Sequence, residues 1–411
     1  MSVLSSSNRE ASSSSDSGAP KVRPPLGRVR VLHVNPGNLY GGVETILVTL
    51  ARLRHLSPGM EPRYALCYEG RLSRELMEAG VAVDLIGEVR ISHPWTVSRA
   101  RRRLSEIVGR EAFDLVICHS PWSLAIFGDT VHGAGQKLAM WAHIYHTGQH
   151  WLERLARRVK PDVVIASSHY AEGGARRLFP TVPSEVVYPP VELIEMPERE
   201  IWRSKVRREH GVKDDTVVII QVGRMEGAKG HGLHLEALQK LKDLETRWVC
   251  WMVGGPQRSQ EQDYLRKIQA IARELGLDQR VRFLGERVDV PELLAGADVF
   301  CQPNTTPEPF GIVFIEALWA GRPVVTTAMG GPLEIVDDSC GLLVPPEDPL
   351  ALAESLRSLI ESEESRRRLG LRGAARAREL CDPALGMEKL RKLSQPRTPS
   401  GNVDRRQGDS K

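Results

Sequence analysis

Two glutamates in the stretch PEPFGIVFIEALWAGRPVV (307–325) raise the first chemical question, because only seven residues separate Glu308 from Glu316. Glu316 follows Ile312 by about one helical turn, so it borders an apolar stripe and does not point to open solvent. A carboxylate at such a position needs hydrogen-bond donors, since an unpaired and desolvated charge is costly. Sugar or ribose hydroxyl groups are suitable donors, and an internal salt bridge to a nearby arginine is the alternative.

A phosphate group is the second ligand that these residues favour. The loop at 305–309 leads into a helix, and the N–H groups at a helix start can bind an anion. The segment NPGNLYGGVET (35–45) has a similar arrangement, a Gly-rich loop between a predicted strand and a helix. Gly41 and Gly42 would let a ligand approach the backbone there, and a turn chosen only for its geometry is the alternative. The spacing is not the Gly-x-Gly-x-x-Gly of a dinucleotide site.

Two cations follow a predicted strand in VGRMEGAKGHG (222–232). This loop differs from a P-loop, because Ala228 and Gly230 stand where a P-loop has glycine before the lysine and a hydroxyl residue after it. The loop thus lacks the magnesium ligand but keeps Arg224 and Lys229. Two converging positive charges suit a diphosphate that no metal neutralises, and a solvated pair of surface side chains is the alternative.

Histidines are the third group of candidates. Several of the twelve lie at the ends of predicted strands, namely His33, His119, His143, His146 and His169. Within MWAHIYHTGQH (140–150), the spacing of His143, His146 and His150 resembles that of metal ligands. No carboxylate or cysteine lies beside them, so we predict no metal site. An individual histidine is more often structural than catalytic.

Short β-branched runs alternate with longer helical patterns along most of the chain. The first series of predicted strands is 28–36, 64–68, 81–87, 113–120 and 161–168, with a helix at 41–54. The second series is 216–224, 247–255, 281–287, 297–303, 322–328 and 341–345, and it follows a charged helix at 197–211. Apolar runs separated by helices predict parallel sheets covered on both faces. We therefore expect two doubly wound α/β domains with a ligand site in the cleft between them.

The chain of 411 residues is long enough for two domains. We expect a disordered tail at 1–27, an N-terminal domain at 28–192, a C-terminal domain at 193–382, a helix at 383–393 that packs back on the first domain, and a disordered tail at 394–411. The six cysteines are predicted to be reduced core residues. The formal net charge of +4 argues neither for nor against an acidic partner. No apolar run has the roughly 18 residues of a membrane span, and the N-terminus lacks a signal-peptide core, so the cytoplasm is the expected location.

Taken together, these motifs resemble the retaining glycosyltransferases of family 4, whose GT-B fold has two Rossmann-like domains facing across a cleft. The resemblance rests on Gly-Arg and Lys-Gly within 223–230, on the Glu-x7-Glu of EPFGIVFIEALWAGRPVV, and on GGPLEIV (330–336). Gly-Gly-Val-Glu at 41–44 and His-Ser at 119–120 match more loosely. The resemblance covers about residues 29–392, and its C-terminal motifs are specific as a set.

The resemblance implies transfer of a sugar from a nucleotide diphosphate sugar, with UDP or GDP as the expected nucleotide. It implies retention at the anomeric carbon and needs no metal or other cofactor. The implied catalytic residues are His143, Glu308, Arg224 and Lys229, with His146 as the alternative histidine. The implied donor-binding residues are Gly41, Gly42, Arg224, Lys229, Phe310, Gly311, Ile312 and Glu316. Arg224 and Lys229 would hold the diphosphate, Glu308 the sugar and Glu316 the ribose, while VRFLGER (281–287) would line the base pocket. The sequence YPP (188–190) departs from the family, which often has Asn-Gly there.

Other classes of function stay open at this point. An epimerase of the same architecture would release nucleotide and sugar without an acceptor, and a degenerate transferase would only bind nucleotide sugars. The expected acceptor is a glycan, a lipid-linked molecule or a small molecule, and we expect no nucleic-acid partner. Basic helices at 98–110 and 152–160 favour peripheral contact with anionic lipid at the inner membrane face, with a solvated helix face as the alternative.

Overall fold

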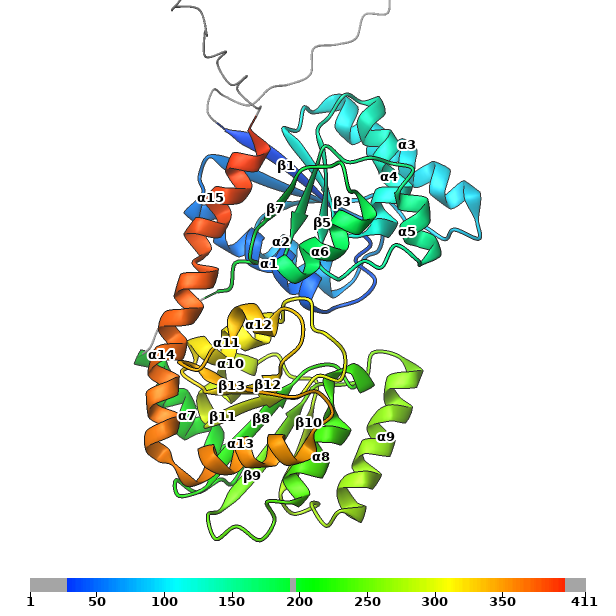
Figure 1. Cartoon of the computed structure of the whole chain (residues 1–411). Helices are drawn as coiled ribbons and strands as arrows, with labels where there is room; N and C mark the ends of the chain where they lie inside the picture. The colour runs from blue at the N-terminus through cyan, green and yellow to red at the C-terminus, as the bar shows by residue number, and fades with distance from the viewer. Residues whose placement is uncertain (1–27, 193–196, 396–411) are drawn as a thin grey trace, which may run out of the picture.

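The computed structural model describes residues 28–192 and 197–395. The predicted tails therefore lie outside the described residues, apart from Ser394 and Gln395. The described chain forms two α/β domains, which lie one above the other in Figure 1, and each is built on its own parallel sheet. This architecture confirms the predicted fold class.

The first domain contains a seven-stranded sheet in the order β3-β2-β1-β4-β5-β6-β7, in which all neighbouring strands are parallel. Its strands are β1 (Val29–Asn35), β2 (Met60–Leu66), β3 (Ala82–Leu85), β4 (Leu115–Cys118), β5 (Leu138–Ala142), β6 (Val163–Ala166) and β7 (Ser184–Val186). Its helices are α1 (Gly42–Arg52), η1 (Leu53–Leu56), α2 (Arg71–Glu78), α3 (Pro94–Arg110), α4 (Pro121–Gly133), α5 (Trp151–Ala156) and α6 (His169–Leu178). The central strands are buried because helices cover both faces of the sheet.

The second domain contains a six-stranded parallel sheet in the order β10-β9-β8-β11-β12-β13. Its strands are β8 (Val217–Val222), β9 (Trp248–Val253), β10 (Val281–Gly285), β11 (Val299–Gln302), β12 (Val324–Thr327) and β13 (Gly341–Val344). Its helices are α7 (Pro197–Glu209), η2 (Gly227–Lys229), α8 (His231–Gln239), α9 (Ser259–Glu274), α10 (Val290–Gly296), α11 (Ile312–Trp319), α12 (Pro332–Ile335), α13 (Pro349–Glu361) and α14 (Glu363–Cys381).

The last helix, α15 (Pro383–Ser394), returns the chain to the first domain and lies beside it in red at the end of the colour bar (Figure 1). Its side chains Met387 and Leu390 are fully buried and join the core beneath β1. The Lys137 ammonium donates to the Leu393 carbonyl over 2.7 Å. The C-terminal helix thus follows the second domain in the chain but buries its apolar side chains against the first domain, which ties the two domains together.

The strand order reverses direction between β1 and β4 in the first sheet and between β8 and β11 in the second. At such a point the loops leaving two neighbouring strands run to opposite faces, and a crevice opens at the carboxyl ends of the strands. The two crevices face each other across the domain boundary. Among the described residues, no helix combines the length and the apolar character that crossing a bilayer requires.

Candidate functional site

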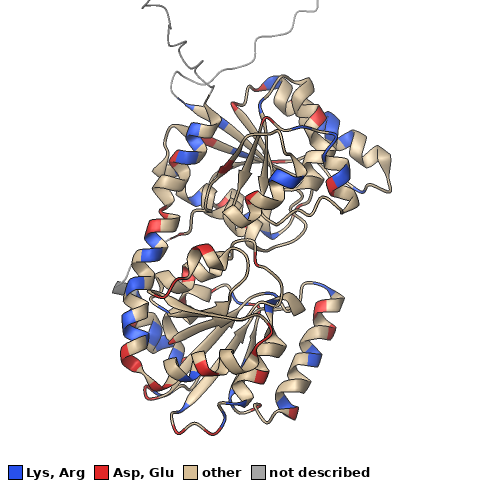
Figure 2. Ribbon diagram, in the orientation of Figure 1, with Lys and Arg blue, Asp and Glu red and all other residues tan. Residues whose placement is uncertain are grey.

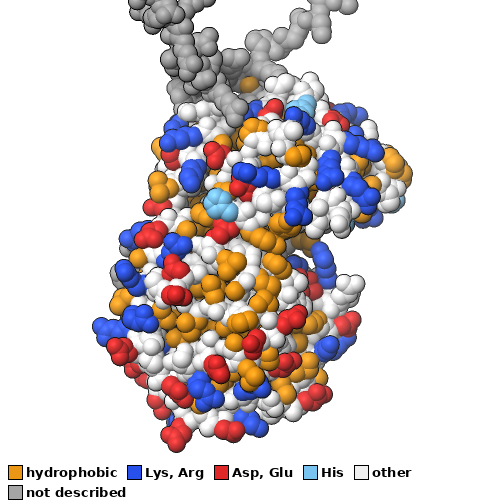
Figure 3. Space-filling model, viewed as in Figure 1, with side chains coloured by type: hydrophobic (Ala, Val, Ile, Leu, Met, Phe, Trp, Pro, Cys, Tyr) orange, Lys and Arg blue, Asp and Glu red, His pale blue; other side chains and the backbone are white. Residues whose placement is uncertain are grey.

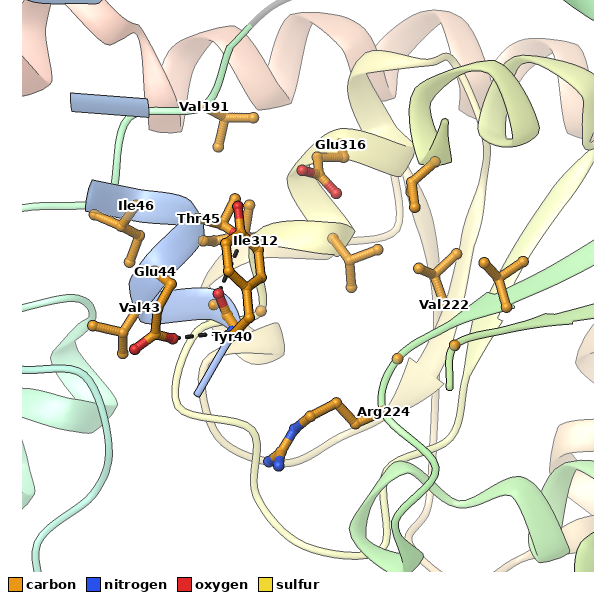
Figure 4. Close-up of a pocket in the computed structure, with 18 of the residues that line it drawn as sticks. Tyr40, Val43, Glu44, Thr45, Ile46, Val191, Val222, Arg224, Ile312 and Glu316 are labelled. Atoms are coloured by element: carbon orange, nitrogen blue, oxygen red, sulfur yellow. Dashed lines mark hydrogen bonds between the residues drawn. The ribbon is translucent and has the colours of Figure 1, made fainter. Parts of the chain in front are cut away.

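A cleft of about 1000 Å³ lies between the two domains. It is lined from the first domain by the loop before α1, and from the second by the loops after β8 and β11. In the space-filling view, the outline of the molecule narrows where the two domains meet (Figure 3). Figure 4 shows Arg224 and Glu316 on the second-domain wall, with Tyr40 and Glu44 bordering the same space from the first domain.

Lys229 and Arg224 lie where the sequence predicts them, at the carboxyl end of β8, and both line the cleft. The Lys229 ammonium is 2.5 Å from a carboxylate oxygen of Glu308, and both side chains are mostly buried. The Gln221 amide holds the backbone of this turn by donating to the Lys229 carbonyl over 2.7 Å. Arg224 pairs with Glu261 at 3.2 Å. The turn therefore presents two cations whose present partners are carboxylates, which an incoming diphosphate can displace or share.

Glu308 belongs to a loop that is fixed on the second domain before α11 begins. Its backbone pairs with Gly330 in strand fashion, and the Gly331 N–H donates to the Glu308 carbonyl over 2.7 Å. Gly311 precedes the helix with a φ of +88°, and a Cβ there would come within 2.3 Å of the Phe314 ring. Only glycine fits this start, and no side chain caps it. The start of α11 thus lacks a side-chain cap, and its first residues Ile312 and Val313 line the cleft, an arrangement that suits the binding of an anion.

Glu316 lies one turn into α11 and lines the cleft. Its carboxylate has no hydrogen-bond partner within residues 28–192 and 197–395, so the internal salt bridge is not formed there. Burial raises the pKa of Glu316 from 4.5 to about 7. A carboxylate that faces a cleft without donors of its own is suited to accept hydrogen bonds from ligand hydroxyl groups.

The first-domain wall differs in part from the expectation. The Gly41 N–H donates to the Glu44 carboxylate over 3.0 Å, and Asn35 donates to the same carboxylate over 3.2 Å. A negative charge therefore already occupies the start of α1, which makes this helix start less suited to phosphate than that of α11. A Cβ on Gly42 would meet nothing within 4 Å, so the folded chain itself does not require glycine there. The open space at Gly42 lies on the cleft.

The ring of His143 is engaged inside the first domain, although the residue lines the cleft. Its Nε2 is 3.0 Å from Nδ1 of His119, and its Nδ1 is 3.0 Å from the Ser167 hydroxyl. No ring nitrogen remains for a direct hydrogen bond to a sugar. His146 is buried, contacts Glu153 over 2.9 Å and does not line the cleft. In the described part of the chain, no three His, Cys, Asp or Glu side chains gather as metal ligands would.

Glu334, from the motif GGPLEIV, connects the two domains at one edge of the cleft. Its carboxylate accepts from the N–H groups of His169 and Tyr170, over 2.9 and 2.8 Å, at the start of α6. The Tyr188 hydroxyl donates to it over 3.0 Å, and the Tyr188 ring stacks on Phe310. A carboxylate at a helix start with three donors is a strong interdomain contact.

Two further hydrogen bonds cross the boundary beside the candidate site. The Ser168 hydroxyl of the first domain donates to the Pro309 carbonyl over 2.5 Å. On the other side of the cleft, the Gln257 amide donates to the Tyr40 carbonyl over 2.7 Å. The loop that carries Glu308 is therefore attached to both domains.

The structure gathers nearly all the predicted site residues around one cleft. The predicted residues that line it are Gly41, Gly42, His143, Arg224, Lys229, Glu308, Phe310, Gly311, Ile312 and Glu316. Of the predicted base-pocket segment 281–287, only Glu286 and Arg287 reach it. Sequence reasoning missed Ser167, although the Ser-Ser pair that ends the predicted strand at 161–168 is a usable signal.

The comparisons with known proteins agree with this geometry. Residues 203–376 match the family model described as Glycosyl transferases group 1. The lipopolysaccharide glucosyltransferase WaaG of Escherichia coli K12 is 35% identical over 186 residues, which is 45% of this chain and 46% of WaaG. The D-inositol 3-phosphate glycosyltransferase of Corynebacterium jeikeium K411 is 34% identical over 207 residues, 49% of this chain and 48% of that protein. The chain thus spans about half the length of the curated relatives that it matches.

Similarity of structure extends over both domains. Anabaena HepE, solved in complex with UDP and glucose, superposes with a TM-score of 0.76 at 23% identity, covering 89% of this chain and 99% of HepE. The crystal structure of WaaG superposes with a TM-score of 0.65 at 20% identity, covering 89% and 100%. Residues 203–376 are therefore similar in sequence to the glycosyl transferases of group 1, and the two domains together have the GT-B fold of glycosyltransferases.

Proposed function

We propose that this protein is a glycosyltransferase that moves a sugar from a nucleotide diphosphate sugar to an acceptor, with retention of the anomeric configuration and without a metal ion. The observation that carries the proposal is the arrangement around one interdomain cleft. Two cations and an uncapped helix start lie beside an unpartnered carboxylate, Glu316. This set matches the diphosphate and the hydroxyl groups of such a donor. The matches to group 1 glycosyltransferases support the reaction class.

The charge that develops on the leaving diphosphate determines what the site must stabilise. As the bond to the sugar breaks, negative charge grows on the phosphate oxygen atoms, and preorganised cations and N–H dipoles lower the energy of that state. Lys229, Arg224 and the N–H groups of Phe310, Gly311 and Ile312 supply both. Glu308 holds the Lys229 ammonium in place and contacts the sugar hydroxyls. Closure of the two domains keeps water from the reacting carbon.

The first experiment is a thermal-shift assay with UDP, GDP and ADP. A ligand at 100 times its Kd stabilises a protein by about 2.7 kcal/mol, so we expect a clear rise in Tm with UDP or GDP. The rise should be unchanged in the control variant Lys240→Ala, because Lys240 is exposed beyond the end of α8. If none of the three nucleotides raises Tm, the proposal is wrong.

Two measurements on the product separate the finer parts of the proposal. Transfer should continue in EDTA, and activity that is lost in EDTA and restored by Mg²⁺ or Mn²⁺ would show a metal-dependent enzyme. NMR of the anomeric proton should give an α-linked product from an α-linked donor. A β-linked product would contradict retention. The donor pool should include UDP-glucose and GDP-mannose, with lipid extract, glycans and small polyols as acceptors.

We also propose that the first domain contacts anionic membrane peripherally, which suits a lipid-linked acceptor. On α3, Arg99, Arg102, Arg103 and Arg110 are exposed. Trp95 at the start of the same helix is 65% exposed, and large aromatic side chains favour the lipid interface. The helix α4 packs against both α3 and α5, and α5 and the turn after it carry the exposed cations Arg154, Arg157 and Arg158. Figure 2 colours the Lys and Arg positions along the ribbon of these helices blue.

A charge-neutralised variant tests this contact. Replacing Arg99, Arg102 and Arg103 with glutamine should weaken binding to phosphatidylglycerol vesicles, by about 1 kcal/mol for each cation near the surface. Co-sedimentation at 50 and 300 mM salt measures the effect. The matched control neutralises the exposed Arg367, Arg368 and Arg372 on α14 of the second domain. Binding that is absent in the wild type, or equally weakened by both triple variants, would remove the proposal.

A further inference from the structure

Four polar side chains form a hydrogen-bonded row across the carboxyl ends of neighbouring strands. His33 lies in β1, while His119, His143 and Ser167 directly follow β4, β5 and β6. These four strands lie side by side in the sheet, about 4.8 Å apart. The His33–His119, His119–His143 and His143–Ser167 distances are 2.9, 3.0 and 3.0 Å, and the Trp141 indole N–H donates to the Ser167 hydroxyl over 3.0 Å.

The three imidazole rings of the row lie edge to edge, as their in-plane hydrogen bonds require. The rings of His33 and His119 have centroids 5.2 Å apart, those of His119 and His143 are 5.3 Å apart, and the planes are tilted by 28° and 13°. The Trp141 ring stacks on both His119 and His143. The rings are therefore held against rotation by packing as well as by hydrogen bonds. One end of the row reaches the cleft, because His143 and Ser167 line it.

Each histidine in the row is neutral near pH 7. Burial lowers the pKa of His33 and of His143 to about 3, and burial with the neighbouring histidines lowers that of His119 well below its usual range. A neutral imidazole carries one N–H and one bare nitrogen. Each hydrogen bond needs one donor and one acceptor, so the tautomer of one ring fixes the tautomers of the others. Only two arrangements of the row satisfy all three bonds.

In the first arrangement, the Ser167 hydroxyl donates to Nδ1 of His143, and the Nε2–H groups of His143 and His119 donate along the row. His33 then holds a buried Nε2–H group. In the second arrangement, the Nδ1–H groups of His33, His119 and His143 donate toward Ser167. The Ser167 oxygen then accepts two hydrogen bonds, one from His143 and one from Trp141, and its own proton is free.

The His33 end distinguishes the two arrangements. Nε2 of His33 is buried and has no hydrogen-bond partner among the described residues. Orphaned buried N–H groups are rarer in proteins than under-satisfied acceptors, so a bare nitrogen is the better occupant of this position. The second arrangement also strengthens the Ser167 O–H as a donor, because accepting hydrogen bonds polarises a hydroxyl group.

We propose that the three histidines are fixed as Nδ1–H tautomers and direct the Ser167 hydroxyl to donate a hydrogen bond to an oxygen of the donor sugar. This inference rests on the proposed function. The neighbouring Ser168 holds the Pro309 carbonyl, next to Glu308, so Ser167 lies at the sugar end of the site. His143 then acts as a positioning residue for Ser167, and His119 and His33 fix its tautomer. The row is not a proton path to solvent, because it ends in the core at His33.

NMR of the free protein with ¹⁵N-labelled histidine tests the tautomers without any substrate. The ¹⁵N shift separates a protonated ring nitrogen from a bare one, and spectra of His33→Phe, His119→Phe and His143→Phe assign the signals. We expect a protonated Nδ1 and a bare Nε2 on all three rings at pH 7. Protonated Nε2 on these rings would overturn the proposal. The wild-type spectrum decides this point even if a variant does not fold.

Binding measurements test the contact with the sugar. Removing one hydrogen bond costs about 1 kcal/mol or slightly more, so Ser167→Ala should weaken UDP-glucose binding roughly five- to tenfold. The affinity of Ser167→Ala for UDP alone should equal that of the wild type. His119→Phe should likewise bind UDP-glucose more weakly than the wild type and UDP equally well. Equal losses for UDP and UDP-glucose, or no loss for either, would contradict the inference. Failure of the wild type to bind any nucleotide would instead contradict the proposed function.

Discussion

Replacing Lys229 with alanine should lower the turnover of a nucleotide sugar by about 10²- to 10³-fold, the usual effect of removing one preorganised donor from a developing negative charge. Lys229 is mostly buried at the end of β8, and its ammonium lies 2.5 Å from Glu308. Its position is fixed before the donor binds, so little reorganisation is needed when the phosphate becomes more negative. Single-turnover kinetics with a saturating donor measure the chemical step directly.

The fold should survive this change, because the Lys229 side chain belongs to the cleft wall and not to the apolar core. Far-ultraviolet circular dichroism and Tm check the fold. Lys229→Arg keeps the charge but not its position, so it should recover only part of the rate. Lys240→Ala removes an exposed lysine at the end of α8, the helix that follows Lys229 in the chain, and should behave like the wild type. A Lys229→Ala variant with unaltered turnover would exclude Lys229 from the reaction.

Replacing Glu316 with glutamine should increase stability above pH 7 and at the same time weaken donor binding. Burial raises the pKa of Glu316 in the folded protein to about 7, above the ordinary 4.5. The folded state therefore holds its proton more tightly than the unfolded state, and stability from this group is lost as the pH rises from about 4.5 to 7. At about 1.4 kcal/mol for each pKa unit, the full shift is roughly 3 kcal/mol. Water in the cleft reduces this, so we expect a gain of about 1–2 kcal/mol.

Chemical denaturation at pH 5 and at pH 8 measures the change in the free energy of unfolding, and the gain in stability of Glu316→Gln should be larger at pH 8. Titration with UDP at the same pH values measures the change in nucleotide affinity. The terminal phosphate of UDP ionises at about pH 6 and affects both proteins alike, so wild-type affinity should rise between pH 5 and pH 8 by more than that of the variant, because only the wild type also gains the ionised carboxylate. The control, Glu354→Gln on the exposed face of α13, should show neither effect. A variant that gains no stability at pH 8, or that binds UDP as tightly as the wild type, would contradict the role given to Glu316.

The sequence was sufficient to predict the second domain closely. All six of its strands were predicted, because each is an apolar run bounded by glycine, proline or charged residues. In the first domain, β5 and β7 were not predicted. The β5 sequence LAMWA has no β-branched residue, so its pattern does not separate strand from helix, and β7 has only three residues.

Part of the candidate site is formed by residues that are close together in the sequence, and part by residues that are far apart. Glu308 and Glu316 lie on one loop and its helix, and Arg224 and Lys229 share another loop, so their spacing along the chain predicts their proximity. The histidine row depends on the register of neighbouring strands. Its hydrogen-bonded pairs His33–His119 and His119–His143 are separated by 86 and 24 positions along the chain. No local pattern contains that register. The resemblance implied His143 as a catalytic residue, and nothing near it in the sequence indicated the hydrogen bond between its ring and Ser167.

The contacts of Glu334 and Ser168 have a consequence for the order of events in a catalytic cycle. The loop with Pro309 and Glu308 is fixed on the second domain and is also hydrogen-bonded to the first, so separation of the domains removes one of the contacts that position the loop that would grip the donor. Separation of the two domains and the loss of donor affinity would then be coupled in one equilibrium. An acceptor that binds to the first domain and favours the joined state would tighten the donor by the same factor by which the donor tightens the acceptor. Productive pairs of substrates would thus be retained together, while a donor bound alone would be released before water could consume it.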